Sequence, residues 1–201
     1  MAVVSNGTTL IDNGTLDAAV PTGKMTLLST QTASASATIS FTSGIDDTYD
    51  SYVFKFYNIH PATDDVTFGF QTDTGTNTNY NQTITSTFFQ ARHLEADSLA
   101  ALSYTTNRDL AQGTSFQVLN YDLGNENDES LSGILQLFNP SSTTFVKHFI
   151  SKVSNYGQAG EAADCFAAGY FNTTTALTRV RFQMSSGNID SGVIKLYGIG
   201  G

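Results

Sequence analysis

The stretch Thr178–Ser185, with the sequence TRVRFQMS, alternates strictly between polar and apolar side chains. Val180, Phe182 and Met184 fall on one face, and the two arginines fall on the other face with the glutamine. A period of two is typical of a β-strand that buries one of its faces. We therefore expect the three apolar residues to point into a core and the arginines to point outward.

A run of turn formers follows at residues 186–192, and a second apolar segment occupies residues 193–199. We expect these two strands to pair antiparallel and to close the fold. Earlier segments that are rich in β-branched, aromatic or alternating residues predict strands at 25–32, 33–41, 51–57, 66–71, 83–89, 131–138, 143–153 and 164–172. About ten strands separated by turn signals predict an all-β fold, an antiparallel two-sheet β-sandwich of jelly-roll type.

Three segments are less regular. Residues 91–102 fit the helical period in part, so they predict either a helix or a strand through Arg92 followed by a loop. Residues 72–81 are polar, and we expect an exposed, mobile loop there. The small side chains of Ala35 and Ala37 in the strand at 33–41 suggest close approach of another sheet or another chain.

Composition limits the classes of partner. Only 13% of the 201 residues are charged, and the net charge is −9. Nucleic acid is an unsuitable partner for such a chain, because binding it requires a basic surface that releases counterions. Anionic membrane surfaces are excluded for the same reason. The single cysteine, Cys165, has no internal disulfide partner and is expected to be a buried, inert thiol.

The N-terminal residues 1–23 differ from the sandwich domain expected at residues 24–201. Two Asn-Gly-Thr repeats, at 6–8 and 13–15, are each followed by apolar residues, and the segment has too few apolar residues to fold alone. It is either a ragged terminus or first strand, or an extended arm that becomes ordered on a neighbouring subunit. In the second case the residues that contact a subunit or a capsid would be Val3, Val4, Leu10, Ile11 and Leu16. No signal-peptide pattern is present at this terminus.

No stretch of the sequence predicts catalysis, a cofactor or a metal site. The histidines, His60, His93 and His148, lack a metal-ligand spacing. The acidic loop 122–129 is either a solvated loop or a site for a hard cation such as calcium, although it lacks the calcium-loop pattern. A glycosidase needs two carboxylates at a suitable separation, for which the candidates are Glu95, Glu126, Glu129 and Glu161.

Four blocks of sequence resemble a family of tailed-bacteriophage virion proteins that are common in aquatic phages. They are MTLLSTQTASASA at 25–37, YDSYVF at 49–54, IHPATD at 59–64 and SGVIKLYGI at 191–199. The resemblance implies a β-sandwich structural protein that is exposed on the particle surface. It leaves open whether the protein decorates the capsid or belongs to the tail or a fibre.

Our leading hypothesis is a non-enzymatic virion protein that decorates or cements the capsid as a homotrimer. Its partners would be the major capsid protein or other virion proteins, with the arm anchored on neighbouring subunits. The alternative is a tail or fibre domain that binds a host-surface glycan through loops such as 72–81 and 155–160. A glycan hydrolase is a third hypothesis.

Overall fold

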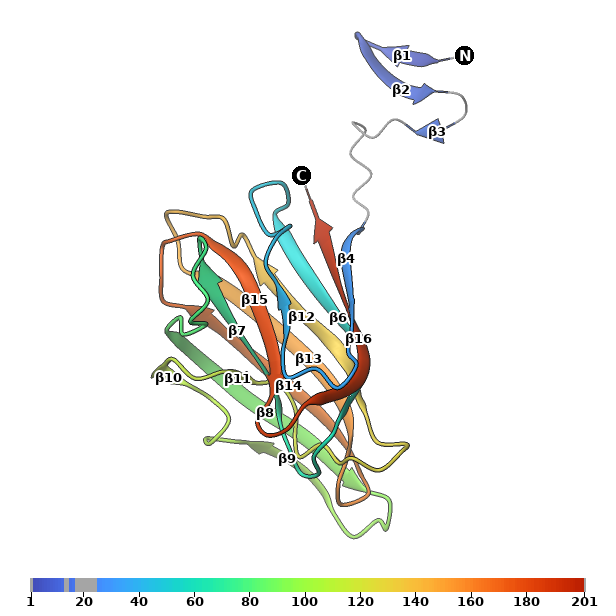
Figure 1. Cartoon of the computed structure of the whole chain (residues 1–201), viewed down its shortest axis with the longest axis vertical. Helices are drawn as coiled ribbons and strands as arrows, with labels where there is room; N and C mark the ends of the chain where they lie inside the picture. Colours follow the sequence, from blue (N-terminus) through green and yellow to red (C-terminus); the bar gives the residue numbers. More distant parts are fainter. Residues whose placement is uncertain (1, 13–14, 17–24, 201) are drawn as a thin grey trace.

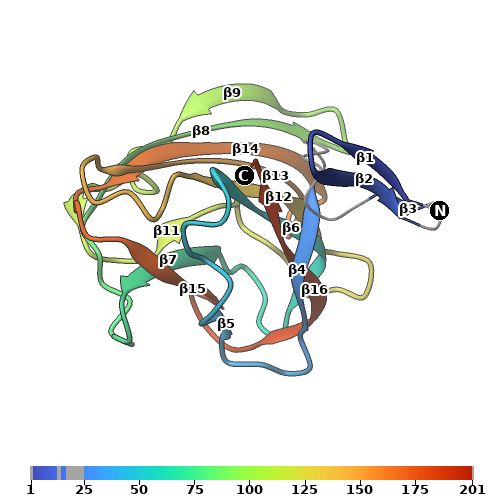
Figure 2. The same cartoon turned by 90° about the horizontal axis from the view of Figure 1, so that it is seen from above.

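The computed structural model describes residues 2–12, 15–16 and 25–200. The described residues form strands, turns and loops without any helix, and every paired strand is antiparallel, which confirms the all-β class. Figure 2 shows two sheets facing each other, as in a β-sandwich. Nothing in the described part of the chain forms a helix of the length and hydropathy that a bilayer crossing requires.

The strands are distributed over three sheets. The nine-stranded sheet contains β4 (Thr26–Thr32), β6 (Ser51–Pro61), β8 (Ile84–Leu94), β9 (Ala100–Tyr104), β10 (Ala111–Gly113), β12 (Leu131–Phe138), β13 (Lys147–Gly157), β14 (Glu161–Phe171) and β16 (Ile189–Ile199). The four-stranded sheet contains β5 (Ile39–Phe41), β7 (Phe68–Thr74), β11 (Gln117–Val118) and β15 (Leu177–Met184). A small N-terminal sheet contains β1 (Val3–Ser5), β2 (Thr8–Asp12) and β3 (Thr15–Leu16).

The strand pairings follow a simple order in the two large sheets. Counting inward from the C-terminal strand, β16 pairs with β4, β15 with β5, β12 with β6 and β11 with β7. The chain thus resembles one long hairpin whose two arms are folded over into a sandwich. Two insertions, β8–β10 and β13–β14, pair with each other and extend the larger sheet beyond β12 (Figure 1).

The core lies between the facing sheets and is centred on Phe182. Val180, Phe182 and Met184 are buried, and Arg179 and Arg181 are half-buried on the opposite face, so the predicted register of β15 is confirmed. The ring of Phe182 lies 5.2–6.3 Å, between centroids, from five other phenylalanines that come from both sheets: Phe41, Phe54, Phe56, Phe68 and Phe70. Aromatic rings at these distances make edge and offset contacts that stabilise the core.

The predicted pairing of the two last strands is wrong. β15 pairs with β5 and β7, whereas β16 pairs with β4 and β6, so the residues between them cross from one sheet to the other. Alternation identifies the buried face of a strand but carries no information on which strand lies beside it. Both strands keep their apolar face toward the same core, although they belong to opposite layers.

The predicted helix at 91–102 is also wrong. The alternative, a strand through Arg92 followed by a loop, is confirmed as far as residue 99, after which a further strand begins. β8 continues to Leu94, and a short turn leads into β9 at Ala100. Within that turn Asp97 has a φ of 54°, which an α-helix excludes. The inserted strands β14 and β9 take up the backbone hydrogen bonds of β8 on its two sides.

Two further expectations need correction. Only Ile39–Phe41 of the predicted strand at 33–41 is a strand, and Ala35 and Ala37 are exposed, with Ala35 at a φ of 48°. The alanines therefore leave no gap in the core. The loop expected at 72–81 begins inside β7, and only residues 75–79 and 81 of it are exposed. Tyr80 is buried, and its backbone N–H donates to the buried carboxylate of Asp73.

The described residues of the N-terminal segment form a small three-stranded antiparallel sheet instead of one continuous extended strand. Asn6 and Gly7 have φ angles of 49° and 82°, which suit a two-residue hairpin turn between β1 and β2. Val3, Val4 and Ile11 are exposed on this sheet, and Leu10 is half-buried. The side chain of Leu16, residues 17–23 and the boundary expected at 23/24 lie outside the described residues.

Candidate functional site

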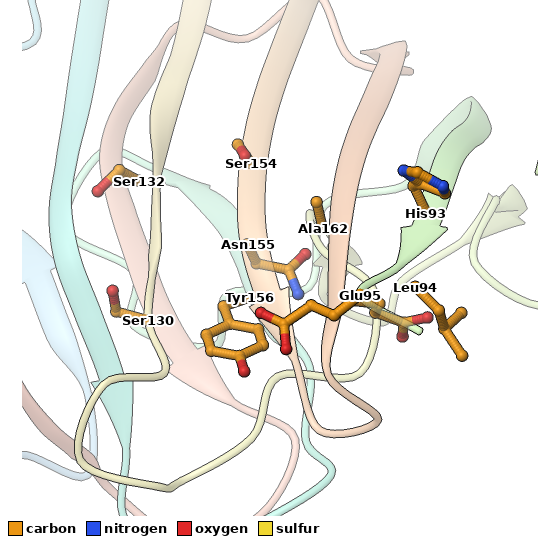
Figure 3. A pocket seen from close by; sticks show the side chains of 10 residues that line it. His93, Leu94, Glu95, Ser130, Ser132, Ser154, Asn155, Tyr156 and Ala162 are labelled. Atoms are coloured by element: carbon orange, nitrogen blue, oxygen red, sulfur yellow. The ribbon is translucent and has the colours of Figure 1, made fainter. Parts of the chain in front are cut away.

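A hollow of about 490 Å³ opens at one end of the nine-stranded sheet, on the face that points away from the core. Figure 3 shows its side chains, with Ser130 and Ser132 on one side, His93 and Leu94 on the other, and Tyr156 between them. Its remaining lining residues are Glu95, Ser154, Asn155, Glu161 and Ala162. The residues come from β8, β12, β13, β14 and the adjoining turns.

Strand register explains the shape of this hollow. Ser132 lies opposite Ser154, and Ala162 lies opposite both Tyr156 and His93 on the neighbouring strands. Small side chains thus follow one another across three strands and leave the surface low. Glu95, in the turn after β8, and the ring of Tyr156 complete the lining around them. The hydroxyl groups offer hydrogen bonds, and Leu94 adds apolar surface.

Tyr156 and Glu95 set the electrostatics of the opening. The negative charge of Glu95 raises the pKa of the Tyr156 phenol, with further contributions from burial and from the charge of Asp128. A phenol whose pKa rises in this way lies in a negative potential, because ionisation would add a second negative charge. The hollow therefore favours neutral or positively charged ligand groups over anionic ones.

A buried polar cluster lies beneath the hollow and holds its floor in place. The guanidinium of Arg92 donates through Nε, at 2.9 Å, and through Nη2 to Oε2 of Glu161, whose side chain is 1% exposed. Arg92 also stacks on the ring of Tyr121 at 3.8 Å from the centroid, and Arg108 lies over the same ring at 4.7 Å. Arg108 in turn bonds to Asp122 at 2.6 Å, so each guanidinium has its own carboxylate.

Asn155 joins this cluster to β13. Its side-chain Nδ2 donates to the carbonyl oxygen of Tyr121 at 2.8 Å. Its Oδ1 faces Sγ of Cys165 at 3.9 Å, deep in the sheet. Cys165 is 0% exposed, which confirms the buried thiol expected from the sequence.

Burial raises the pKa of the Cys165 thiol to about 12. In the unfolded chain an exposed thiol ionises near pH 8.5. Between these values the folded protein keeps a proton that the unfolded chain loses, so stability falls as pH rises. We expect the loss to reach about 2 kcal/mol by roughly pH 10, since each pH unit contributes about 1.36 kcal/mol.

Urea unfolding from pH 8 to 10 on the wild type and on Cys165→Ala would measure this loss. Ionisation of the tyrosines affects the pH dependence of both proteins equally. The difference between their slopes of unfolding free energy against pH therefore isolates the contribution of the thiol. Parallel slopes would contradict the prediction. Alkylation of the native protein at pH 8 should also be slow and should become fast only after unfolding.

A second hollow, of about 530 Å³, adjoins the first at Ser130, which lines both. Its lining is acidic and polar: Asn58, His60, Asn127, Asp128, Glu129, Asp190 and Ser191 accompany Ser130. Nδ1 of His60 lies 2.7 Å from the carbonyl oxygen of Glu129, so this nitrogen carries the proton and donates. The pair holds the acidic loop against the end of β6.

The acidic loop at 122–129 is organised by its own contacts. Asp122 is paired with Arg108, and Oε2 of the buried Glu129 accepts a hydrogen bond from the backbone N–H of Glu126 at 2.7 Å. Gly124 lies so close to Glu129 that a Cβ there would meet its carboxylate. Within residues 2–12, 15–16 and 25–200, no group of three His, Cys, Asp or Glu side chains is arranged to hold a metal ion.

Two of the four carboxylates considered for glycan hydrolysis meet in the first hollow, namely Glu95 and Glu161. Glu129 lines the second hollow, whereas Glu126 lines neither of them. The predicted contact residues Val3, Val4, Leu10 and Ile11 lie on the N-terminal sheet and in neither lining. Sequence reasoning included Tyr156 only within the contact loop expected at 155–160, and it missed the serines and Arg92, because only strand register brings these residues together.

No family model, curated protein or solved structure matches this chain.

Proposed function

We propose that this chain is a non-enzymatic structural protein of a tailed-phage virion that decorates or cements the capsid. The sandwich is a jelly roll in this proposal, a fold common in viral coat proteins. The nested pairing of β4 to β7 with β11, β12, β15 and β16 supports it, because folding one long hairpin into two sheets produces a jelly roll. The two insertions enlarge one sheet without disturbing that order.

The observation that carries the anchoring role is the exposed apolar surface of the N-terminal sheet. Val3 and Val4 are 51% and 56% exposed, and Ile11 is 37% exposed. A sheet of three short strands buries too little to be stable alone and gains stability when another surface covers its apolar side chains. The major capsid protein or another virion protein supplies that surface.

Deleting residues 2–20 is expected to leave a folded sandwich that no longer binds particles, because the described sandwich strands begin only at Thr26. Occupancy on particles lacking the protein, measured by quantitative mass spectrometry, provides the readout. Val4→Asp should lower occupancy strongly, and Ser5→Asp on the same strand is the matched control. Full occupancy of the truncated protein would show that the anchor lies elsewhere.

A homotrimer is the assembly that we propose for the sandwich. Its support is the outer face of the nine-stranded sheet, where Ile134, Ile150 and Phe89 are 41–52% exposed. Phe89 stacks on Phe166 there at 4.8 Å, and Lys152 lies over the second ring. Exposed apolar patches of this kind mark association surfaces.

Light scattering of the purified protein is expected to give about three times the chain mass of 21.5 kDa. Ile150→Arg should lower that mass by placing a charge in the interface. Ala37→Arg serves as the control, because Ala37 is exposed on the connection before β5, outside the apolar outer face. A monomeric wild type, or equal effects of the two changes, would contradict the trimer.

Glycan binding by a tail or fibre domain is the second candidate function. The hollow lined by Tyr156, Glu95 and the serines favours it. Asn155 and Tyr156 fall in the segment 155–160 that the sequence suggested as a contact loop, although both belong to β13 rather than to a loop. Hydrolysis is less well supported, because Glu161 is held by Arg92 and an acid catalyst must carry and release a proton.

The copy number per particle distinguishes a position on the capsid from a position on the tail or a fibre. Hundreds of copies indicate the capsid, and a few to tens indicate the tail or a fibre.

A further inference from the structure

The first hollow carries an uncompensated negative charge. Glu161 is neutralised by Arg92, and His93 is engaged by Asp97 at 3.0 Å on the rim. Within the described part of the chain, no basic side chain lies within 4 Å of the carboxylate of Glu95. A ligand that brings a positive charge would therefore form a charge-assisted hydrogen bond that the free protein lacks.

The same hollow has the shape and the polar groups of a small-ligand site. Its volume of about 490 Å³ falls within the range of roughly 300–1,000 Å³ that is typical of such sites. Hydroxyl groups on Ser132, Ser154 and Tyr156 can donate and accept hydrogen bonds. Leu94 and Ala162 supply apolar surface, against which the C–H face of a sugar ring can lie.

The second hollow continues the surface beyond Ser130 with the same sign of charge. Asp128, Glu129 and Asp190 line it, and Nδ1 of its histidine, His60, donates a hydrogen bond to a backbone carbonyl. A ligand that extends from the first hollow past Ser130 thus meets further carboxylates. This arrangement suits a chain with repeated positive charges rather than a single small cation.

We propose that the two hollows form one groove that binds an oligosaccharide bearing free amino groups, with one protonated amine at Glu95. The inference rests on the second candidate function, glycan binding, and names the class of glycan. The ring hydroxyls are held by the serines and Tyr156, while further amines face the acidic residues of the second hollow. Glycans that carry carboxylates or sulfates are excluded by the same charges.

Calorimetric titration of the full chain at about pH 6, where an amine is protonated, tests the proposal. The probes are the β-1,4-linked tetramers of glucosamine and of N-acetylglucosamine and the α-1,4-linked tetramer of galacturonic acid, which carry positive, zero and negative charge. We expect the glucosamine tetramer to bind at least about tenfold more tightly than the neutral tetramer. The galacturonate tetramer should not bind.

Glu95→Gln keeps the shape of the side chain and removes its charge. It should weaken binding of the glucosamine tetramer about tenfold and affect binding of the neutral tetramer much less. Glu126→Gln is the matched control, because Glu126 is exposed and lines neither hollow. Equal losses in the two variants would indicate a general effect of net charge and would overturn the proposal.

Three other outcomes also decide the question. Binding of the neutral tetramer that equals or exceeds that of the cationic one would overturn the charge inference but leave glycan binding intact. Failure of all three tetramers would overturn the glycan-binding function as well. Trilysine that binds as tightly as the glucosamine tetramer would assign the groove to basic peptides and would likewise overturn the proposal.

Discussion

Replacing Phe182 with alanine is expected to lower the free energy of unfolding by about 4 kcal/mol, within the range of roughly 3–5 kcal/mol for buried aromatic residues. The ring is 0% exposed and contacts five phenylalanines from both sheets. Its removal leaves a cavity that rigid neighbouring strands cannot close. Urea unfolding followed by circular dichroism measures the change, and Phe182→Leu, which keeps most of the volume, should recover much of the loss.

Phe89→Ala is the matched control for this experiment. Phe89 lies midway along β8, but it is 41% exposed, and its aromatic contact within the chain is the stacking on Phe166. A cost of about 1 kcal/mol is expected for it, in line with a single aromatic pair. Similar losses in the two variants would show that Phe182 is not at the centre of the core.

Arg92→Met is expected to destabilise the protein by about 3–5 kcal/mol, because it leaves a buried carboxylate without its positively charged partner. Glu161 is 1% exposed, and within the described part of the chain both of its side-chain hydrogen bonds come from Arg92. Glu161→Gln should cost less, since the side chain of Arg92 is 20% exposed and its guanidinium keeps its stacking on Tyr121. The double variant Arg92→Met/Glu161→Gln is expected to be more stable than Arg92→Met alone.

The wild type, the two single variants and the double variant form a double-mutant cycle. The exposed ion pair Lys152–Asp164 supplies the control for it. Its side chains are 56% and 40% exposed, and its N–O distance is 3.4 Å. Lys152→Met should therefore cost less than about 1 kcal/mol, as is usual for exposed ion pairs. Thermal or urea unfolding of the four proteins in the Arg92–Glu161 cycle measures the coupling energy between these two side chains. A coupling energy near zero would contradict the buried ion pair.

Local pattern in the sequence was sufficient for the all-β class, for most strands and for the face that each strand buries. β15 is the clearest case, because Val180, Phe182 and Met184 repeat every second residue and a strand has the same period. The buried state of Cys165 also followed from its apolar neighbours. These features depend on residues that are close in the chain, so that the sequence alone determines them.

Tertiary structure alone decided which strands lie side by side and which side chains meet in the hollow. β15 and β16 are adjacent in sequence but belong to opposite sheets, and residues 91–102 became β8 and β9 because β14 offered an edge to pair with. Glu95, Ser132 and Tyr156 come from three distant segments. Their approach depends on strand order and register, which are set by contacts across the whole core and which no local periodicity encodes.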